Sequence, residues 1–397
     1  MKRLGLFLGV EASAGGMFQY AQTILESLAA LPSTEYRIDV AYASHVWQPV
    51  LSGYPFAATK LRHGDWGLRF AHTLMAAQIP AAMGRRISFS FNPIARQLRR
   101  MSCDMWIFPA QDAIAYQLPL PSVVSVHDLM HRYERRFPEV GGGYRFHIRE
   151  HRFRNLALWA EGILVDSEIG RAQVVESYGV DAEKVYSLPY VPAPNVYRDR
   201  GNQSVKSAYG LPAKFLFYPA QFWAHKNHES LISAAASVRS ECPDIHLVFT
   251  GAKRHRYEHI RAHAASLGMM NHITYLGHVP DDDLCGLYRS ARALIMPTFL
   301  GPTNIPPLEA LACDCPVAVS GIYAMPEQLG NAALYFDPRS VTAMADVLKR
   351  LWLDDALCRS LVERGRQKIA SWNQEQFNQR LREILKRIDS RSRTPVA

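Results

Sequence analysis

One stretch in the last third of the chain combines a strand end, a loop and a proline-led helix in a way that suits an anion. It runs from Pro297 to Val319 and reads PTFLGPTNIPPLEALACDCPVAV. The two prolines suit the first turn of a helix over Leu308 to Cys313, and the amides and positive dipole end of such a start attract a phosphate. Glu309, one turn in, can accept both hydroxyls of a ribose that follows the phosphates. Alone, Glu309 is explained equally well as an acid that satisfies the helix dipole.

A second candidate pair, His127 and Asp128, directly follows the apolar run Val123 to Val126. It therefore stands at the carboxyl end of a predicted strand, where open α/β folds bind ligands. An imidazole at that place can hydrogen-bond a sugar and stabilise charge as a glycosidic bond breaks. For Asp128 a turn or helix-cap role is equally compatible with the sequence.

Two segments with consecutive glycines are further candidates for loops that contact a ligand. Gly15 and Gly16, in EASAGGMFQYAQ, are expected to open the first helix after the first strand and to permit close approach of a ligand to the backbone. The full G-x-G-x-x-G of dinucleotide binders is absent. Gly141 to Gly143 lacks the Gly-Lys-Ser/Thr of a phosphate-binding loop and is expected to be a flexible loop.

Acidic and thiol residues do not indicate a metal site. Asp281 to Asp283 begin a predicted helix, where an acidic cap and first turn are favoured by the dipole. Cys313 and Cys315 have no second Cys or His pair nearby to complete a tetrahedral site. We therefore expect no metal and no bound cofactor.

Short apolar runs alternate with longer amphipathic stretches throughout the chain, which is typical of parallel sheets covered by helices. The fold class that this predicts is α/β, with two Rossmann-like, doubly wound domains. The predicted strands are Leu4 to Val10, Ile38 to Ala43, Met105 to Pro109, Val123 to Val126, Ile163 to Val165, Val185 to Leu188, Phe215 to Pro219, His246 to Thr250, Ile273 to Leu276, Ala293 to Met296, Val317 to Val319 and Ala333 to Phe336.

The domain boundary is expected in a segment rich in proline and polar residues, Pro189 to Ser204. This places an N-terminal domain over 1–190 and a C-terminal domain over 205–371, with a cleft between the carboxyl ends of their sheets. A helix over 372–390, with Phe377, Leu381, Leu385 and Ile388 at helical spacing, is expected to pack back across the junction.

Length and composition agree with two folded domains. The chain has 397 residues, of which 48% are hydrophobic and 20% charged. We expect no signal peptide, because the first apolar run is short, and no stretch is long and apolar enough for a membrane span. The six scattered cysteines then favour a reduced, cytoplasmic setting.

Much of the formal charge of +9 lies early in the chain. Between Lys60 and Arg100 there are eight Lys or Arg against the single acid Asp65. The segment also contains Trp66, Phe70, Phe89 and Phe91, so it could contact an anionic membrane, such as the inner face of a plasma membrane, or a phosphorylated lipid carrier. A solvated helix face explains the charge equally well. Nucleic acid is disfavoured because no known binding module accompanies the charge.

The stretch IPPLEALACDCPVAV resembles the second half of the E-x7-E signature of retaining glycosyltransferases with the GT-B fold, family 4 (group 1). Three further features come in the order and spacing of that family: FWAHKNH at 222–228, Gly251 after the next strand, and LGHVPDDDLCGLYRSARALIMP at 276–297. The N-terminal half is less similar, through Gly15 and Gly16, VHD at 126–128 and VDSE at 165–168.

The resemblance implies a role for individual residues in binding a nucleotide-diphosphate sugar, with GDP as the favoured nucleotide. Lys226 matches the lysine that neutralises the diphosphate and Glu309 the carboxylate that holds the ribose. The loop that approaches the phosphates and the sugar corresponds to Thr303, Asn304 and Ile305. The turn that lines the base corresponds to Gly277, His278 and Val279, and His127 matches a histidine near the donor sugar.

Two positions depart from the pattern of the family. Gly301 stands where the first signature glutamate normally contacts the donor sugar, and Gln221 replaces an arginine that precedes the lysine. The resemblance implies metal-independent, retaining transfer to a saccharide or lipid-linked acceptor, with mannose or rhamnose as the sugar and a bacterial surface polysaccharide or lipopolysaccharide as the product. The departures leave two alternatives open: a catalytically silent nucleotide-binding or partner-binding protein, and a nucleotide-sugar epimerase.

Overall fold

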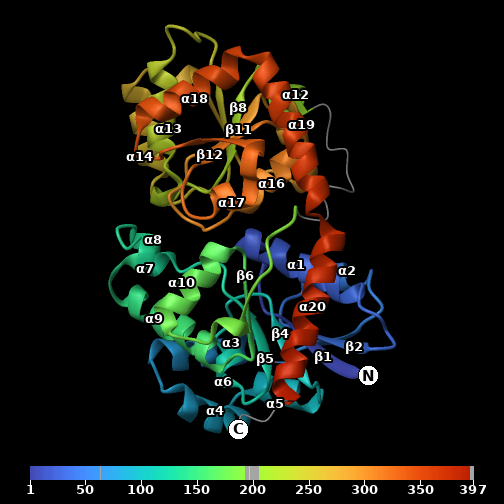
Figure 1. The fold of residues 1–397 in the computed structure, drawn as a ribbon. Coiled ribbons are helices and arrows are strands. Elements are labelled where there is room, and N and C mark those ends of the chain that lie inside the picture. The colour runs from blue at the N-terminus through green and yellow to red at the C-terminus, as the bar shows by residue number, and fades with distance from the viewer. Residues whose placement is uncertain (63, 193–195, 197–204, 394–397) are drawn as a thin grey trace. The chain divides into compact units, whose positions relative to one another are not determined.

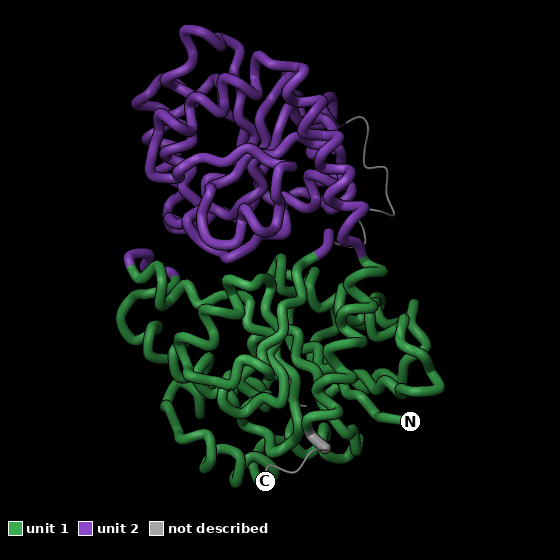
Figure 2. The backbone as a smooth tube through the Cα atoms, viewed as in Figure 1, with its two compact units in different colours: residues 1–135, 140–190, 374–397 green, residues 136–139, 191–373 purple. Residues whose placement is uncertain are grey.

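The computed structural model describes residues 1–62, 64–192, 196 and 205–393, which fall into two compact units (Figure 2). The first comprises 1–135, 140–190 and 374–397, and the second comprises 136–139 and 191–373. Within the predicted linker Pro189 to Ser204, residues 193–195 and 197–204 lie outside the described residues.

The first unit is built on a parallel sheet of seven strands in the order β3-β2-β1-β4-β5-β6-β7 (Figure 1). The order reverses between β1 and β4, which makes this unit doubly wound. The strands are β1 Lys2–Leu8, β2 Tyr36–Tyr42, β3 Ala57–Lys60, β4 Met105–Phe108, β5 Ser122–Ser125, β6 Gly162–Val165 and β7 Val185–Ser187.

The short edge strand β3 was not predicted. Its sequence is AATK and all four residues are exposed, so it has no apolar run or alternation by which a strand is recognised. It forms because its backbone pairs with β2, from Asp39 opposite Ala57 to Tyr42 opposite Lys60. The other six strands of this unit begin and end within two residues of their predicted ends.

Helices cover both faces of this sheet. On one face Trp106, Phe108 and Phe153 are fully buried, and the core there also includes Ile94 and Leu98. The helices that precede the linker, including short 3₁₀ turns, are η1 Ala12–Ala14, α1 Gly16–Ala29, α2 Trp47–Leu51, α3 Gly64–Ala76, α4 Ala81–Phe91, α5 Pro93–Arg100, α6 Ile114–Gln117, α7 Met130–Tyr133, α8 Pro138–Gly141, α9 Gly143–Trp159, α10 Glu168–Tyr178 and η2 Ala182–Lys184.

The last helix, α20 (Gln374–Arg393), packs on the first unit. Its stripe of Phe377, Leu381, Leu385 and Ile388 is at most 1% exposed, as the helical spacing of these residues predicts. Polar contacts join its two ends to the same unit: Gln374 donates to the Ser27 hydroxyl at 2.9 Å, and Lys2 pairs with Asp389 at 2.6 Å.

The second unit contains a parallel sheet of six strands in the order β10-β9-β8-β11-β12-β13. All six were predicted, because each is a short, mainly apolar run between turn residues. They are β8 Leu216–Pro219, β9 Leu247–Thr250, β10 Ile273–Gly277, β11 Ala293–Met296, β12 Val317–Ser320 and β13 Ala333–Phe336. Two Rossmann-like, doubly wound units are thus present, which confirms the predicted fold class.

The helices of the second unit flank this sheet (Figure 1). They are α12 Val205–Ala208, η3 Ala224–Lys226, α13 His228–Ser237, α14 Tyr257–Ser266, η4 Met270–His272, α15 Asp281–Ser290, α16 Ile305–Ala312, α17 Met325–Leu329, η5 Gly330–Ala332, α18 Val341–Leu353 and α19 Asp355–Ser371. The strand order reverses between β8 and β11, so a ligand is expected at the carboxyl ends of these two strands.

Candidate functional site

Lys226 lies in the connection that leaves the carboxyl end of β8. The 3₁₀ turn η3 ends at Lys226, and the Tyr218 hydroxyl on β8 donates to the Lys226 carbonyl at 2.9 Å. Asn227, which follows with a positive φ of 58°, donates from its side chain to the carbonyls of Pro297 (3.1 Å) and Pro338 (2.9 Å). These bonds fix Lys226 against the loop that follows β11.

The Lys226 ammonium has no hydrogen-bond or ion-pair partner among the residues that the structure describes. Its side chain is half-buried, and burial lowers the pKa of the ammonium to about 8. Nearby His228 is buried, and burial followed by the charge of Lys226 lowers the pKa of its imidazole to about 3. Lys226 is therefore a desolvated cation without a counter-charge, which suits an anionic ligand.

A second cation, Arg254, lies beside Gln221, which replaces an arginine of the family that the sequence resembles. The Arg254 guanidinium donates through Nε to the Gln221 side chain at 2.8 Å and lies 5.0 Å from the centre of the Trp223 ring. Arg254 follows β9, whereas the family arginine would follow β8. The sequence gives no sign that these two connections meet, so Arg254 was not predicted.

The loop after β11 leads into α16 much as its sequence predicts. The helix runs over Ile305–Ala312, three residues earlier than expected, with a proline in its first turn and Asn304 as the N-cap. Two features of the helix start bear on the predicted phosphate site. The Asn304 amide already donates to the Gln328 side chain at 3.1 Å, and Gln328 donates back to the Asn304 carbonyl at 2.9 Å. Because Pro306 and Pro307 have no amide hydrogen, a phosphate at this helix start would meet fewer amide donors than expected.

Glu309 lies one turn into α16 and is only 3% exposed. The Tyr288 hydroxyl on α15 donates to its Oε2 at 2.9 Å. This bond orients the carboxylate and was not predicted, because Tyr288 is 21 residues away on another helix. Burial, followed by the Glu309 charge and their hydrogen bond, raises the pKa of Tyr288 well above its usual value, so Tyr288 stays a neutral donor.

The glycines after β9 and β10 have backbone shapes that other residues rarely adopt. Gly251 has a φ of 126°, and a Cβ there would lie 2.6 Å from the Ala220 carbonyl oxygen. Gly277 has a φ of 72°, and its carbonyl accepts from the Gly251 amide at 2.7 Å. The turn continues through His278, which is exposed, and Val279, which is buried. The four residues thus adjoin one another at the carboxyl ends of β9 and β10.

Gly301, where the signature has glutamate, has a φ of 96°. A Cβ at this position would lie 2.8 Å from the Thr303 carbonyl oxygen and 2.9 Å from the Asn304 side-chain nitrogen. The loop is therefore folded around a glycine, and a glutamate could not be introduced without moving Thr303 or Asn304.

In the first unit, Gly15 and Gly16 stand where β1 leads into α1, as predicted. Gly15 is the N-cap with a φ of 59°, Gly16 is the first helical residue, and both are exposed. No side chain caps this helix start.

The His127 ring is held from both sides after β5. Its Nε2 lies 2.9 Å from the Pro109 carbonyl oxygen and its Nδ1 lies 2.7 Å from the Tyr190 hydroxyl. Since a carbonyl can only accept, Nε2 carries the hydrogen and Nδ1 accepts from Tyr190. Burial lowers the pKa of His127, which keeps the ring neutral. A sugar hydroxyl could bind this ring only by displacing one of the two protein groups.

Asp128 combines a turn role with an ion pair. Its Oδ1 accepts from the Met130 amide at 3.0 Å and from Arg149 of α9 at 3.1 Å. Burial alone would raise the pKa of Asp128, but Arg149 and the Met130 amide together lower it. Asp128 is thus a carboxylate held in one position beside His127.

Asp112 is a further acid at the switch point of this sheet, and it was not predicted. It follows β4, and a Cβ added to Gly9, after β1, would lie 3.1 Å from its Oδ1. Burial raises the pKa of Asp112 to about 7, although Arg152 opposes this. Asp112 Oδ2, Gln111 Nε2 and the Nε atoms of Arg149 and Arg152 are all buried without a hydrogen-bond partner. Such a set of unsatisfied groups can hydrogen-bond a polar ligand or water. The rule that selected His127, position after a strand, would also have found Asp112.

Asp281 to Asp283 form the first turn of α15, as predicted, but the predicted acidic cap is wrong, because Pro280 is the N-cap. Asp283 accepts from the Tyr209 hydroxyl at 2.5 Å. Among the described residues no three His, Cys, Asp or Glu side chains gather closely enough to hold a metal ion.

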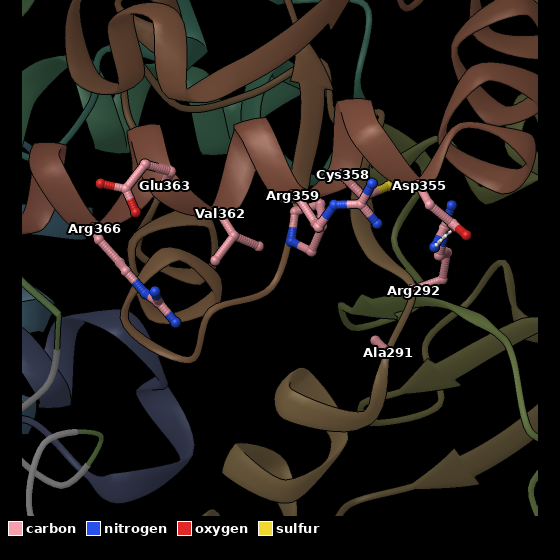
Figure 3. Close-up of a pocket in the computed structure, with 9 residues that line it drawn as sticks. Ala291, Arg292, Asp355, Cys358, Arg359, Val362, Glu363 and Arg366 are labelled. Carbon is pink, nitrogen blue, oxygen red and sulfur yellow. Dashed lines mark ion pairs between the residues drawn. The ribbon is translucent and has the colours of Figure 1, made fainter.

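A pocket of ≈ 570 Å³ lies elsewhere in the second unit (Figure 3). It is lined by Ala291, Arg292 and Pro316, which precede β11 and β12, and by residues of α19. Arg292 pairs with Asp355 across it at 2.6 Å. This pocket opens at the amino ends of the strands, opposite the edge that carries Lys226 and Glu309, so it is not part of the candidate site.

Comparison with known proteins agrees with this architecture. Both units are Rossmann-like, and the solved structures that resemble the chain have the GT-B fold. The Anabaena protein Alr3699/HepE, solved with UDP and glucose, has a TM-score of 0.74 at 15% identity, over 97% of this chain and 100% of that one. Sucrose-phosphate synthase from Thermosynechococcus elongatus has a TM-score of 0.73 at 17% identity, over 98% and 100%.

The similarity to known sequences lies in the C-terminal part of the chain. Residues 199–368 match the family model described as Glycosyl transferases group 1. The serotype-specific mannosyltransferase WbdA of Escherichia coli is 26% identical over 209 residues, which are 51% of this chain and 26% of WbdA. O-antigen chain mannosyltransferase B of the same species is 41% identical over 96 residues, 23% of this chain and 25% of that protein. The match thus spans about a quarter of the length of these relatives.

Proposed function

We propose that this protein is a retaining glycosyltransferase that uses a nucleotide-diphosphate sugar and requires no metal ion. The proposal rests on two residues at one edge of the sheet in the region that matches group 1. Lys226 is a lysine without a counter-charge, and Glu309 is a carboxylate oriented by Tyr288. Lys226 would meet the diphosphate and Glu309 the ribose. A mannose donor with a GDP nucleotide is favoured, because WbdA and mannosyltransferase B are named as mannosyltransferases.

The reaction follows from where charge develops. The acceptor oxygen forms a bond to the anomeric carbon on the side that the diphosphate leaves, the bond from that carbon to the phosphate oxygen breaks, and the acceptor proton passes to the departing phosphate. Negative charge therefore grows on the diphosphate. Lys226 would stabilise that charge without a metal ion.

The acceptor is proposed to bind the first unit, where Asp112, Gln111 and Arg152 present buried, unsatisfied polar atoms. Hydroxyl groups of a saccharide can satisfy both donors and acceptors in such a set. The product would belong to a bacterial surface polysaccharide, made on a saccharide or lipid-linked acceptor.

The donor is tested by thermal shift against a panel of nucleotide-diphosphate sugars. A true donor at 100 times its Kd should stabilise the fold by about 2.7 kcal/mol and raise Tm accordingly, with EDTA present as well as without it. Glu309→Gln, which keeps the shape and the bond from Tyr288, should lose most of that shift. An unchanged shift in this variant would remove Glu309 from the site, and a shift that required manganese would contradict metal independence.

Asp112→Asn should raise the acceptor KM about tenfold and leave the donor Kd unchanged, because it weakens one hydrogen bond to the acceptor. The measurement is transfer to methyl mannoside as a simple acceptor. The same variant should be more stable at pH 8. The pKa of Asp112 is about 4 in the unfolded chain and about 7 in the folded protein, so its ionisation lowers the stability of the fold as the pH rises between these two values. Asparagine does not ionise and avoids this loss. A variant with normal KM would make Asp112 a purely structural acid.

A catalytically silent protein is the second candidate, favoured by the loop built around Gly301. Such a protein would show the thermal shift but would neither transfer sugar to methyl mannoside nor hydrolyse the donor.

A further inference from the structure

Large exposed apolar side chains gather on one helical layer of the first unit. Ten such side chains are exposed among the described residues, and four of them, Met1, Leu267, Met270 and Leu353, lie elsewhere. The other six are on α3, α4 and α9: Trp66 (55% exposed), Met83 (54%), Phe91 (60%), Tyr144 (59%), Leu158 (51%) and Trp159 (39%). Single exposed apolar residues are ordinary, whereas a cluster marks a surface that binds something.

Specific contacts hold these three helices side by side. The Asn92 side chain donates to the Gly67 carbonyl at 3.1 Å, which brings the end of α4, at Phe91, to the start of α3, at Trp66. The Arg85 guanidinium on α4 lies 4.5 Å from the ring centre of Trp159, at the end of α9. The Tyr144 hydroxyl at the start of α9 donates to the Ala76 carbonyl at the end of α3. We call this surface the α3–α4–α9 face.

The same layer is basic. Five arginines on α3, α4 and the adjoining α5 are exposed: Arg69, Arg86, Arg96, Arg99 and Arg100. None of the five forms an ion pair with a carboxylate in the part of the chain that the structure describes. Arg99 lies instead 4.7 Å from the ring centre of Phe89. Arg96 donates one hydrogen bond to the Ser90 carbonyl at 2.6 Å. The remaining N–H groups of these guanidiniums are available to phosphates while their stems and the rings cover apolar surface.

Charge decides which partner fits. A second copy of the chain carries the same formal charge of +9, so two such faces would repel each other. An anionic bilayer offers phosphates to the arginines and an apolar interior to the rings, and Trp and Tyr prefer that interface. We propose that the α3–α4–α9 face docks the protein on the surface of an anionic lipid bilayer. No helix of the described residues is long and apolar enough to span one.

The test is co-sedimentation of the full chain with vesicles of neutral phosphatidylcholine, alone or mixed with phosphatidylglycerol. The protein should bind the mixed vesicles at low ionic strength and leave them in high salt. Arg69→Gln, Arg86→Gln and Arg96→Gln combined should weaken this binding on the order of 100-fold. The matched control combines Arg261→Gln, Arg350→Gln and Arg359→Gln, which removes the same charge from exposed positions of the second unit.

The apolar part is tested with Trp66→Ala, Met83→Ala and Phe91→Ala combined, against Leu267→Ala, Met270→Ala and Leu353→Ala. The first set should lose vesicle binding while the second keeps it, and circular dichroism should show both sets folded. Absence of binding at low salt, or equal binding by test and control sets, would overturn the proposal. So would self-association of the parent that the first set abolishes. The thermal shift with a nucleotide sugar should survive in every set, so a failure here is separate from a failure of the proposed function.

Discussion

Lys226→Ala is expected to weaken binding of the nucleotide-diphosphate donor roughly 10- to 100-fold, because it removes a charge-assisted hydrogen bond to the diphosphate. The parent lysine is held by its neighbours without a counter-charge, so its favourable interaction is reserved for the ligand. The same substitution should leave Tm at neutral pH unchanged or higher, since a desolvated cation without a partner destabilises the fold. Calorimetric titration and thermal melting measure the two effects.

The pH dependence of donor affinity is a second signature of Lys226. Burial lowers the pKa of its ammonium to about 8, so the free protein loses the charge as the pH rises above that value. Affinity of the parent should therefore fall by up to about tenfold per pH unit above pH 8. Lys226→Ala should lack this dependence on pH.

The control for net charge is Lys349→Ala on α18, which removes an exposed lysine paired with Glu241. It should bind the donor as the parent does. Equal losses in both variants would show that the effect is general electrostatics, and unchanged binding in Lys226→Ala would withdraw Lys226 from the donor site.

All strands except β3 could be predicted because each is a short, mainly apolar run bounded by turn residues. In parallel sheets covered on both faces, burial and sequence pattern coincide. The helix that begins at Asp281 and the proline-led helix that contains Glu309 could also be predicted, since helix starts follow local chemistry. The edge strand β3 could not, because its four residues are exposed and its only reason to form is pairing with β2.

The parts of the site that were not predicted are tertiary contacts between residues far apart in the sequence. Tyr288 reaches Glu309 from another helix, Gln328 occupies the Asn304 amide, and Arg254 reaches Gln221 from the loop after β9. None of these pairs is close in sequence, and each side chain type is common. Gly301 is the opposite case. The sequence shows that the signature glutamate is missing, but only the backbone conformation shows that a side chain at this position would be too close to Thr303 and Asn304.

His127→Ala is expected to lower kcat about 10²- to 10³-fold and to leave the donor Kd nearly unchanged, if His127 acts on the donor sugar in the transition state. The ring is neutral and its Nε2 is committed to the Pro109 carbonyl, so a sugar hydroxyl would bind at Nδ1 in place of the Tyr190 hydroxyl. Tyr190→Phe, which frees Nδ1 and keeps the ring, should therefore retain turnover.

These two variants separate a catalytic His127 from a structural one. A structural histidine would join the ends of β4 and β5 to Tyr190, and its loss would lower Tm. In that case both variants should melt earlier, by a few degrees for each kcal/mol lost, because each leaves a buried polar group unpaired. The measurements are kcat, donor Kd and Tm for both variants and the parent. Full turnover with a lowered Tm in His127→Ala would assign the ring to the fold, and Asp128 would then act as a turn residue that holds Arg149.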